Sequence, residues 1–296
     1  MPQLRLATRG SPLALAQAEV VAGLLRQRHP DMVCEIVIVE TEGDRDQETP
    51  LRILGGRGVF AKHIQVAVLE GRADVAVHSA KDLPSLTPKG LVLAAVPERR
   101  DAADVLVGAT LAGLGPGATV ATGSPRRRAL LLDLRPDLNV VELRGNMTRR
   151  LSAPGQHGID AIVAAAAALE RLDVRPHIME RLDPEVFTPQ VGQGAIALET
   201  RDDETTALVR AISDPEVERC VLAERAFQET LGSGCTIPAG AWATWSGTTL
   251  SLRGVLSHED GHLVCRDHRE GRDPVALGYL VANTVLEEYR RRVDPS

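Results

Sequence analysis

Short apolar segments typical of buried strands alternate with helical patterns through most of the chain before residue 170. This alternation is typical of an α/β fold whose strands pair mostly in parallel. After Cys235 the pattern changes to strand candidates at 250–256 and 263–266 and a helix at about 275–291, which predicts a small α+β module. The eight earlier strand candidates are 4–7, 33–39, 75–77, 92–96, 105–107, 119–121, 140–143 and 161–164.

The length and charge of the chain limit what it can be. Its 296 residues predict two or three domains, taking roughly 100 to 150 residues for each. The net charge of −6 and an aromatic content of 2% argue against a nucleic-acid binder, which needs basic surface and stacking platforms. The sequence shows no long exposed apolar stripe that would require a partner subunit, so we expect a monomer.

Neither a membrane nor a metal is expected from the sequence. The longest apolar run, 161–169, is far shorter than the ~18 residues that span a bilayer. Polar residues interrupt the apolar segment 12–25, which predicts an amphipathic helix rather than a secretion signal, so we expect a cytoplasmic protein. The four cysteines form no C-x-x-C pair and lack metal-ligand spacing, so neither zinc nor a disulfide framework is expected.

The segment HSAKDLP places Lys81 and Asp82 directly after a strand candidate. Ligands of α/β sheets bind at the carboxyl ends of strands, and Pro84 prevents a helix from starting at once. We therefore expect both side chains to face a cleft. The alternative for an isolated Lys-Asp pair is an ordinary solvated turn.

Two similar motifs, ATRGSPL at 7–13 and VATGSPR at 120–126, each follow a strand candidate. Serine at the N-cap and proline at the first helical position start a helix, whose free N–H groups favour an anion. Ordinary capping is the alternative for either motif alone. Together they predict two similar domains that face each other across one anionic ligand.

Arginines gather at the predicted carboxyl ends of these strands. Guanidinium groups pair with carboxylates or phosphates, so such a cluster in an acidic protein indicates a small polyanion. Arg128 and Arg149 are also compatible with solvated surface. The cluster comprises Arg9, Arg126, Arg127, Arg128, Arg144, Arg149 and Arg150.

Two glycine-rich segments complete the candidates. Gly55 to Gly58 lacks the ending of a nucleotide-binding P-loop and is compatible with a lid over an active site. Glycines precede Cys235, so its thiol is either a reachable nucleophile or a small residue in a tight turn.

In order along the chain, these motifs resemble the porphobilinogen deaminase (hydroxymethylbilane synthase) family. The matching segments are ATRGSPLALAQA from Ala7, GDRDQETPL from Gly43, GGRGVFAK from Gly55, ADVAVHSAKDLP from Ala73, ATGSPRRRALL from Ala121, LRGNMTRRL from Leu143, VGQGAIALE from Val191 and GSGCTIPAG from Gly232.

The resemblance implies an enzyme of tetrapyrrole synthesis that joins four porphobilinogen molecules, releases ammonia at each condensation and yields hydroxymethylbilane. It also implies a covalent dipyrromethane cofactor, attached by a thioether to Cys235. Asp82 corresponds to the family's catalytic aspartate, which would stabilise the positive charge formed when ammonia leaves. Lys81 and Arg9 are the other implied catalytic residues.

The same resemblance implies the remaining binding residues. Those for the cofactor, besides Cys235, Lys81 and Asp82, are Ser79, Thr122, Ser124, Arg126, Arg127, Arg144 and Gly145. Those for the substrate are Arg9, Ser11, Gln17, Phe60, Arg144, Arg150 and Arg171.

The implied architecture is two α/β domains similar to type II periplasmic binding proteins, joined by a double hinge, plus the carboxyl-terminal α+β domain. Domain 1 spans 1–98 and 194–213, domain 2 spans 99–193, and the third domain spans 214–296. The alternative function is a non-catalytic binding protein of the same fold for a small anion or a pyrrole.

Overall fold

The computed structural model describes residues 3–41, 59–232 and 238–293. The glycine-rich segment at 55–58 and Cys235 lie outside the described residues. In the described parts of the chain, no helix has both the length and the hydropathy to cross a bilayer.

The first sheet has five strands in the order β2-β1-β3-β10-β4. β1 pairs in parallel with β2 and β3, whereas β10 is antiparallel to both β3 and β4. Helices α1 (Pro12–Arg28), α3 (Val59–Leu69) and α7 (Glu204–Arg210) pack on it. The strands are β1 (Gln3–Thr8), β2 (Val33–Ile38), β3 (Val75–Ser79), β4 (Leu91–Ala95) and β10 (Ile196–Arg201).

The second sheet repeats this topology, with the order β7-β6-β8-β5-β9. β6 pairs in parallel with β7 and β8, and β5 is antiparallel to β8 and β9. The strands are β5 (Asp104–Val107), β6 (Thr119–Ala121), β7 (Asn139–Val141), β8 (Ala161–Ala165) and β9 (Met179–Arg181). Its helices are α4 (Pro125–Leu134), α5 (Met147–Leu151) and α6 (Ala166–Arg171).

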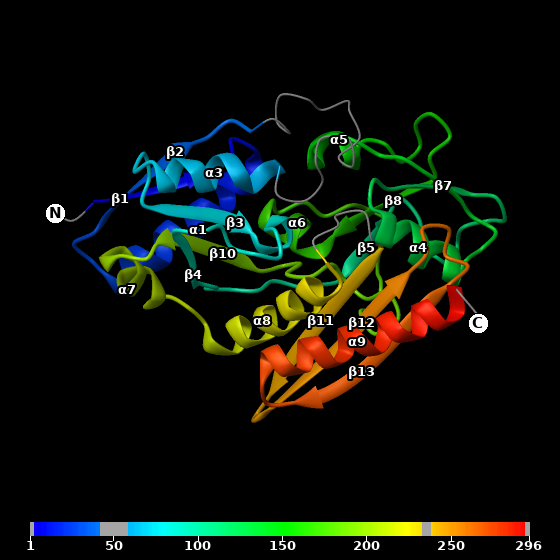
Figure 1. Ribbon diagram of the computed structural model, residues 1–296. Coiled ribbons are helices and arrows are strands. Elements are labelled where there is room, and N and C mark those ends of the chain that lie inside the picture. Colours follow the sequence, from blue (N-terminus) through cyan, green and yellow to red (C-terminus); the bar gives the residue numbers. More distant parts are fainter. Residues whose placement is uncertain (1–2, 42–58, 233–237, 294–296) are drawn as a thin grey trace.

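The carboxyl-terminal part is a third unit, seen below the other two in Figure 1. Strands β11 (Ala239–Ser246), β12 (Thr249–Ser257) and β13 (Val264–Gly271) form an antiparallel sheet. Helices α8 (Pro215–Thr230) and α9 (Pro274–Val293) pack on one another and against this sheet around a shared apolar core.

The predicted fold class, two α/β domains plus an α+β module, is confirmed, and so are the eight early strands to within a few residues. The expectation of mostly parallel pairing was wrong, because half of the pairings in each α/β sheet are antiparallel. The chain crosses from the first sheet to the second near 97–100, before β5, and crosses back near 189–194, before β10, so one antiparallel strand in each sheet follows a crossing. No signal in the sequence singled out β9, β10 or β11. The exact domain boundaries stay a prediction.

The two crossings lie side by side. Arg100 N donates to Gly194 O at 3.0 Å, and Ile196 N donates to Glu98 O at 3.2 Å. Gly194 has a φ of +86°, and a Cβ there would stand 2.4 Å from Arg100 O. Only glycine therefore permits this approach of the two segments.

A buried carboxylate from α8 binds both crossings. Glu224 is fully buried and pairs with Arg99 at 2.6 Å. It also accepts hydrogen bonds from Gly192 N at 2.7 Å and Ala243 N at 2.8 Å. Its two oxygens thereby join the first crossing, the second crossing and β11.

We predict that Glu224→Ala lowers the free energy of unfolding by about 3–5 kcal/mol, because Arg99 would be left as a buried cation without this partner. Urea unfolding monitored by circular dichroism measures the loss. Glu70→Ala is the control, since Glu70 pairs with Arg72 across side chains that are 57% and 52% exposed, and we expect a loss of about 1 kcal/mol or less. Equal losses would contradict the role of Glu224.

Candidate functional site

Lys81 and Asp82 lie in a short 3-10 turn, Ala80–Asp82, directly after β3. The turn is held by the second crossing: Ala80 N donates to Ala195 O at 3.0 Å, and Gln190 Nε2 donates to Lys81 O at 3.0 Å. A Cβ on Gly192 would approach Lys81 N to 3.0 Å. The hinge segment therefore positions the two charged side chains at the end of the strand.

A pocket of about 70 Å³ opens beside this turn. It is enclosed by the end of β1, the start of α1, the start of α3 and the end of β3. Seven side chains that the sequence predicts for the site line it: Arg9, Ser11, Gln17, Phe60, Ser79, Lys81 and Asp82.

The polar groups of the pocket are held in place by one another. The Arg9 guanidinium carbon lies 3.8 Å from the centre of the Phe60 ring, a cation-π contact. Ser79 Oγ donates to Gln17 Oε1 at 3.0 Å. Ser11 Oγ caps α1 by accepting from Ala14 N at 3.3 Å. Ser11 is therefore the N-cap that its motif predicts.

The second motif has the same role at the start of α4. Ser124 is the N-cap, accepting from Arg127 N at 3.4 Å, and Pro125 occupies the first turn. Thr122 Oγ1 accepts from Ser124 N at 3.3 Å. The predicted helix start is confirmed, and an anion-binding role for Thr122 and Ser124 stays a prediction.

Two predicted arginines contact a buried carboxylate inside domain 2. Asp104 is fully buried and pairs with Arg126 at 2.7 Å and with Arg127 at 2.6 Å. Burial raises the pKa of Asp104, but the two guanidinium charges outweigh it and hold the pKa at about 2. Arg126 also donates to Thr188 O at 2.7 Å. The contacts described for these guanidinium groups thus position α4.

The charges of Lys81 and Arg127 nevertheless act on each other. Burial first, and then the positive charge of Arg127, lower the pKa of Lys81 to about 8, while Asp82 works in the opposite direction. Gln193 Oε1 lies 3.5 Å from both Lys81 Nζ and an amino nitrogen of Arg127. Gln193 therefore links the end of β3 to α4.

Arg150 belongs to the same cationic group. Burial, Arg127 and Arg144 lower its pKa to about 10, and Asp82 opposes them. Arg150 Nε donates to Gly145 O at 2.8 Å, which ties the side chain to the turn before α5. Lys81, Arg127, Arg144 and Arg150 thus form a cationic cluster around Asp82, contributed by both α/β domains.

Arg171 lies at the crossings. It pairs with Glu98 at 2.8 Å and donates to Gly194 O at 2.8 Å. Burial lowers the pKa of Arg171, partly offset by Glu98. The described contacts of Arg171 hold the two crossings together, and its predicted role in substrate binding stays a prediction.

Reasoning from motifs missed Asp104, Gln193 and Glu224 as parts of the site's support. Gln193 is fully buried, and its Nε2 donates to Ala102 O and to Asp104 Oδ1, each at 2.8 Å. The pair of glycines that flank Gln193 in VGQG is the sequence signal for its close packing.

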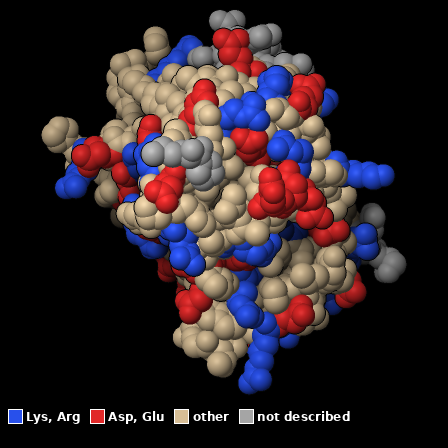
Figure 2. Space-filling view, turned by 90° about the vertical axis from the view of Figure 1, so that its left-hand side faces the viewer, with Lys and Arg blue, Asp and Glu red and all other residues tan. Residues whose placement is uncertain are grey.

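The surface beside the first sheet carries charges of both signs. On the face drawn in Figure 2, Lys and Arg alternate with Asp and Glu, and no extended surface of one sign is visible. The cations described above act on one another and on Asp82, and such a local group of cations suits a small anion.

The family models and the curated relatives that match this chain agree on one family. A family model described as "Porphobilinogen deaminase, dipyromethane cofactor binding domain" matches residues 4–209, and one described as "Porphobilinogen deaminase, C-terminal domain" matches residues 218–287. The chain is 43% identical over 290 residues to the porphobilinogen deaminase of Acidithiobacillus ferrooxidans (strain ATCC 53993 / BNL-5-31), covering 96% of this chain and 95% of the relative.

Two further matches are a second relative found by sequence and a solved structure found by its fold. A porphobilinogen deaminase of Roseiflexus sp. (strain RS-1) is 43% identical over 291 residues, covering 96% of each chain. Among solved structures, the methionine binding protein MetQ aligns with 73% of this chain and 92% of its own, at 15% identity and a TM-score of 0.46.

We predict that the Lys81 amine titrates near pH 8, well below the ordinary value of 10.5. The pH dependence of its acetylation rate, followed by peptide mass spectrometry, measures this, with exposed Lys89 as the control. In the unfolded chain the Lys81 amine stays protonated up to about pH 10.5, whereas in the folded protein it loses its proton near pH 8. The contribution of Lys81 to the free energy of unfolding therefore rises between pH 8 and 10.5. Identical titration of Lys81 and Lys89 would show that the cluster does not act on Lys81.

Proposed function

The chain belongs to the porphobilinogen deaminase family, and from this we propose that it joins four porphobilinogen molecules head to tail into hydroxymethylbilane, with loss of ammonia at each condensation. The observation that carries the proposal is the cationic cluster around Asp82. Burial and the neighbouring positive charges lower the pKa values of Lys81 and Arg150, so the cluster gains stability when anionic groups enter.

The residues present fit a dipyrromethane cofactor. Each pyrrole of this chemistry carries an acetate and a propionate, and carboxylates suit Lys81, Arg144 and Arg150. When bound, the dipyrromethane supplies the primer to which substrate units are added. We propose Cys235 as its attachment point and Ser79, Thr122, Ser124, Arg126, Arg127 and Gly145 as further cofactor-binding residues.

Asp82 is the proposed catalytic carboxylate. It lies in the pocket, and its negative charge partly offsets the lowering of the pKa of Lys81 and of Arg150. A carboxylate at this place stabilises the positive charge that develops on the substrate as ammonia leaves, and it acts less on the neutral ground state. Lys81 and Arg9 flank it and hold the substrate's carboxylates.

The rest of the pocket supports substrate binding. Arg9 is fixed against Phe60, and Gln17 is fixed by Ser79. A guanidinium held in one orientation binds a carboxylate at a smaller entropic cost than a mobile one. We propose that Arg9, Ser11, Gln17 and Phe60 receive the incoming porphobilinogen, together with Arg144, Arg150 and Arg171.

The proposed domain organisation follows the crossings. Domain 1 (1–98 and 194–213) carries Asp82, and domain 2 (99–193) carries most of the arginines. The third domain (214–296) carries Cys235 and, through Glu224, contacts the hinge. The monomeric state and the cytoplasmic location stay predictions, and size-exclusion chromatography with light scattering tests the first.

We predict that Asp82→Ala lowers turnover of porphobilinogen by about 100-fold or more, because the developing cation loses its counter-charge. Porphobilinogen consumption and circular dichroism together measure activity and folding. Asp31→Ala, at an exposed position on the surface, is the matched control and should keep wild-type turnover. Wild-type turnover in the Asp82 variant would remove the carboxylate from the mechanism. A wild-type protein that binds pyrroles without turnover would instead favour the non-catalytic binder.

We predict that Cys235→Ser carries no covalent dipyrromethane, because a serine hydroxyl is far less nucleophilic than a thiol and does not form the thioether. The intact mass of the purified protein measures the adduct, and peptide mapping locates it. Cys34→Ser is the matched control and should retain the added mass. An adduct that persists in the Cys235 variant would mean that another side chain holds the cofactor.

A further inference from the structure

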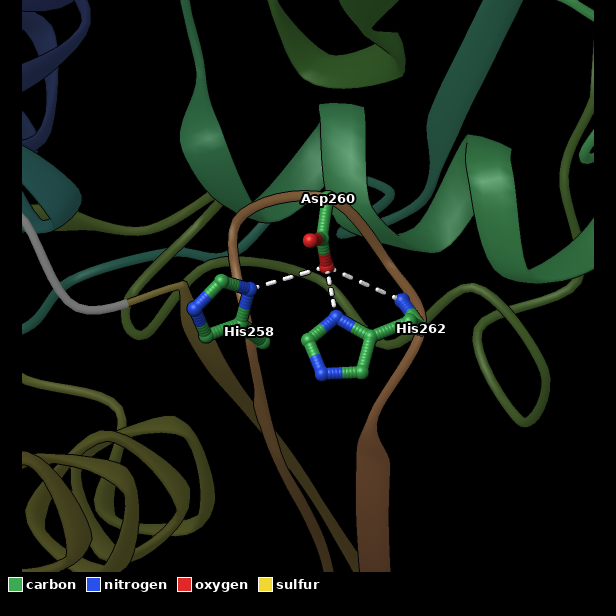
Figure 3. Close-up of side chains that lie close together, drawn as sticks. All are labelled: His258, Asp260 and His262. Carbon is green, nitrogen blue, oxygen red and sulfur yellow. Dashed lines mark hydrogen bonds and ion pairs between the residues drawn. The ribbon is translucent and has the colours of Figure 1, made fainter. Parts of the chain in front are cut away.

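Three side chains with metal-binding atoms converge at the turn between β12 and β13. His258, Asp260 and His262 alternate along the turn, and Figure 3 shows both imidazole rings directed at the Asp260 carboxylate. The backbone holds this arrangement, since His258 N donates to Leu263 O at 2.8 Å and Gly261 N donates to His258 O at 3.1 Å.

The geometry of the three side chains is compact. His258 Nδ1 lies 2.8 Å from Asp260 Oδ1, and His262 Nδ1 pairs with the same oxygen. The three potential ligand atoms all lie within 4.8 Å of one another. The two rings stand 4.5 Å apart at their centroids, tilted by 57°. Ligand atoms around a tetrahedral ion at about 2.0–2.1 Å are about 3.3–3.4 Å apart, so both imidazole nitrogens would move back from Asp260 Oδ1 by small side-chain rotations to admit an ion.

We propose that His258, Asp260 and His262 form a site for a divalent transition-metal ion of the zinc class. Two imidazoles and one carboxylate are a ligand set that Zn²⁺ takes, with water in the remaining position. Ca²⁺ and Mg²⁺ prefer oxygen ligands alone, so they fit less well. The three side chains are 46%, 56% and 62% exposed, so an ion can reach them from solvent.

Binding exchanges one set of contacts for another. A coordinating Nδ1 must offer its lone pair, so a proton on that nitrogen moves to Nε2 or to solvent. The hydrogen bonds to Asp260 are then replaced by metal–nitrogen and metal–oxygen bonds. The expectation that no metal is bound rested on the spacing of the cysteines, and this site contains no cysteine.

The site lies where the hairpin meets domain 2. A Cβ on Gly261 would stand 2.6 Å from Ala129 O in α4. Nearby, Arg266 pairs with Asp133 of the same helix at 2.5 Å. A bound ion would therefore rigidify the turn at this contact and stabilise the folded protein by linkage. No residue of this turn lines the pocket beside Asp82, so turnover should not depend on the ion.

Titration of the intact, cofactor-loaded protein with Co²⁺ and Zn²⁺ tests the proposal. We expect one Co²⁺ per chain with visible d–d bands, displacement of Co²⁺ by Zn²⁺, and a higher melting temperature with Zn²⁺. His258→Ala and His262→Ala should each weaken binding by at least ~10-fold, which corresponds to about 1.4 kcal/mol. His177→Ala, which removes an exposed histidine elsewhere, should bind as the wild type does.

Two results would overturn the proposal. One is Co²⁺ affinity that is unchanged in both His258→Ala and His262→Ala. The other is a thiolate-to-cobalt charge-transfer band, which would place the ion on a cysteine. Because all three proposed ligands are exposed, their substitution should not disturb folding, and circular dichroism checks this for each variant.

Discussion

Glu224 is a buried carboxylate on which both interdomain crossings and the third domain depend. Its oxygens bind Arg99 of the first crossing, Gly192 N of the second and Ala243 N of β11. A buried anion of this kind is costly unless every oxygen is paired, and here the pairing fixes the path of the chain past the end of β3. The turn that carries Lys81 and Asp82 is hydrogen-bonded to the second crossing. The geometry of the site therefore depends on Glu224, although Glu224 does not line the pocket.

A second buried carboxylate organises the arginines that domain 2 contributes near Asp82. Asp104 holds Arg126 and Arg127, and Gln193 joins this group to Lys81. Burial, and then repulsion by neighbouring cations, lower the pKa values of Lys81 and Arg150 beside Asp82. A crevice of this charge suits a ligand rich in carboxylates, and the carboxylate of Asp82 within it suits a reaction that develops positive charge.

Local sequence patterns predicted the parts of this protein whose partners are close along the chain. The serine and proline at 11–12 and 124–125 cap their helices as expected, and the strand patterns identify the early strands of both sheets. The antiparallel pairing of β5 and β10 was not predicted, because hydrophobic periodicity contains no information on pairing direction. β10 was the harder strand to place, since it follows both crossings and yet pairs with β3 and β4, which precede them.

The sequence by itself determined the family, the fold class and the residue types available for chemistry, because contiguous motifs such as HSAKDLP and GSGC preserve them. Only the tertiary structure decided which charges neutralise each other. Arg126 and Arg127 have the same local signature as a ligand-binding arginine, yet both pair with the buried carboxylate of Asp104, about twenty positions away. Arg171 likewise contacts Glu98. Such pairings depend on distances between residues far apart in the chain, and folding alone sets those distances.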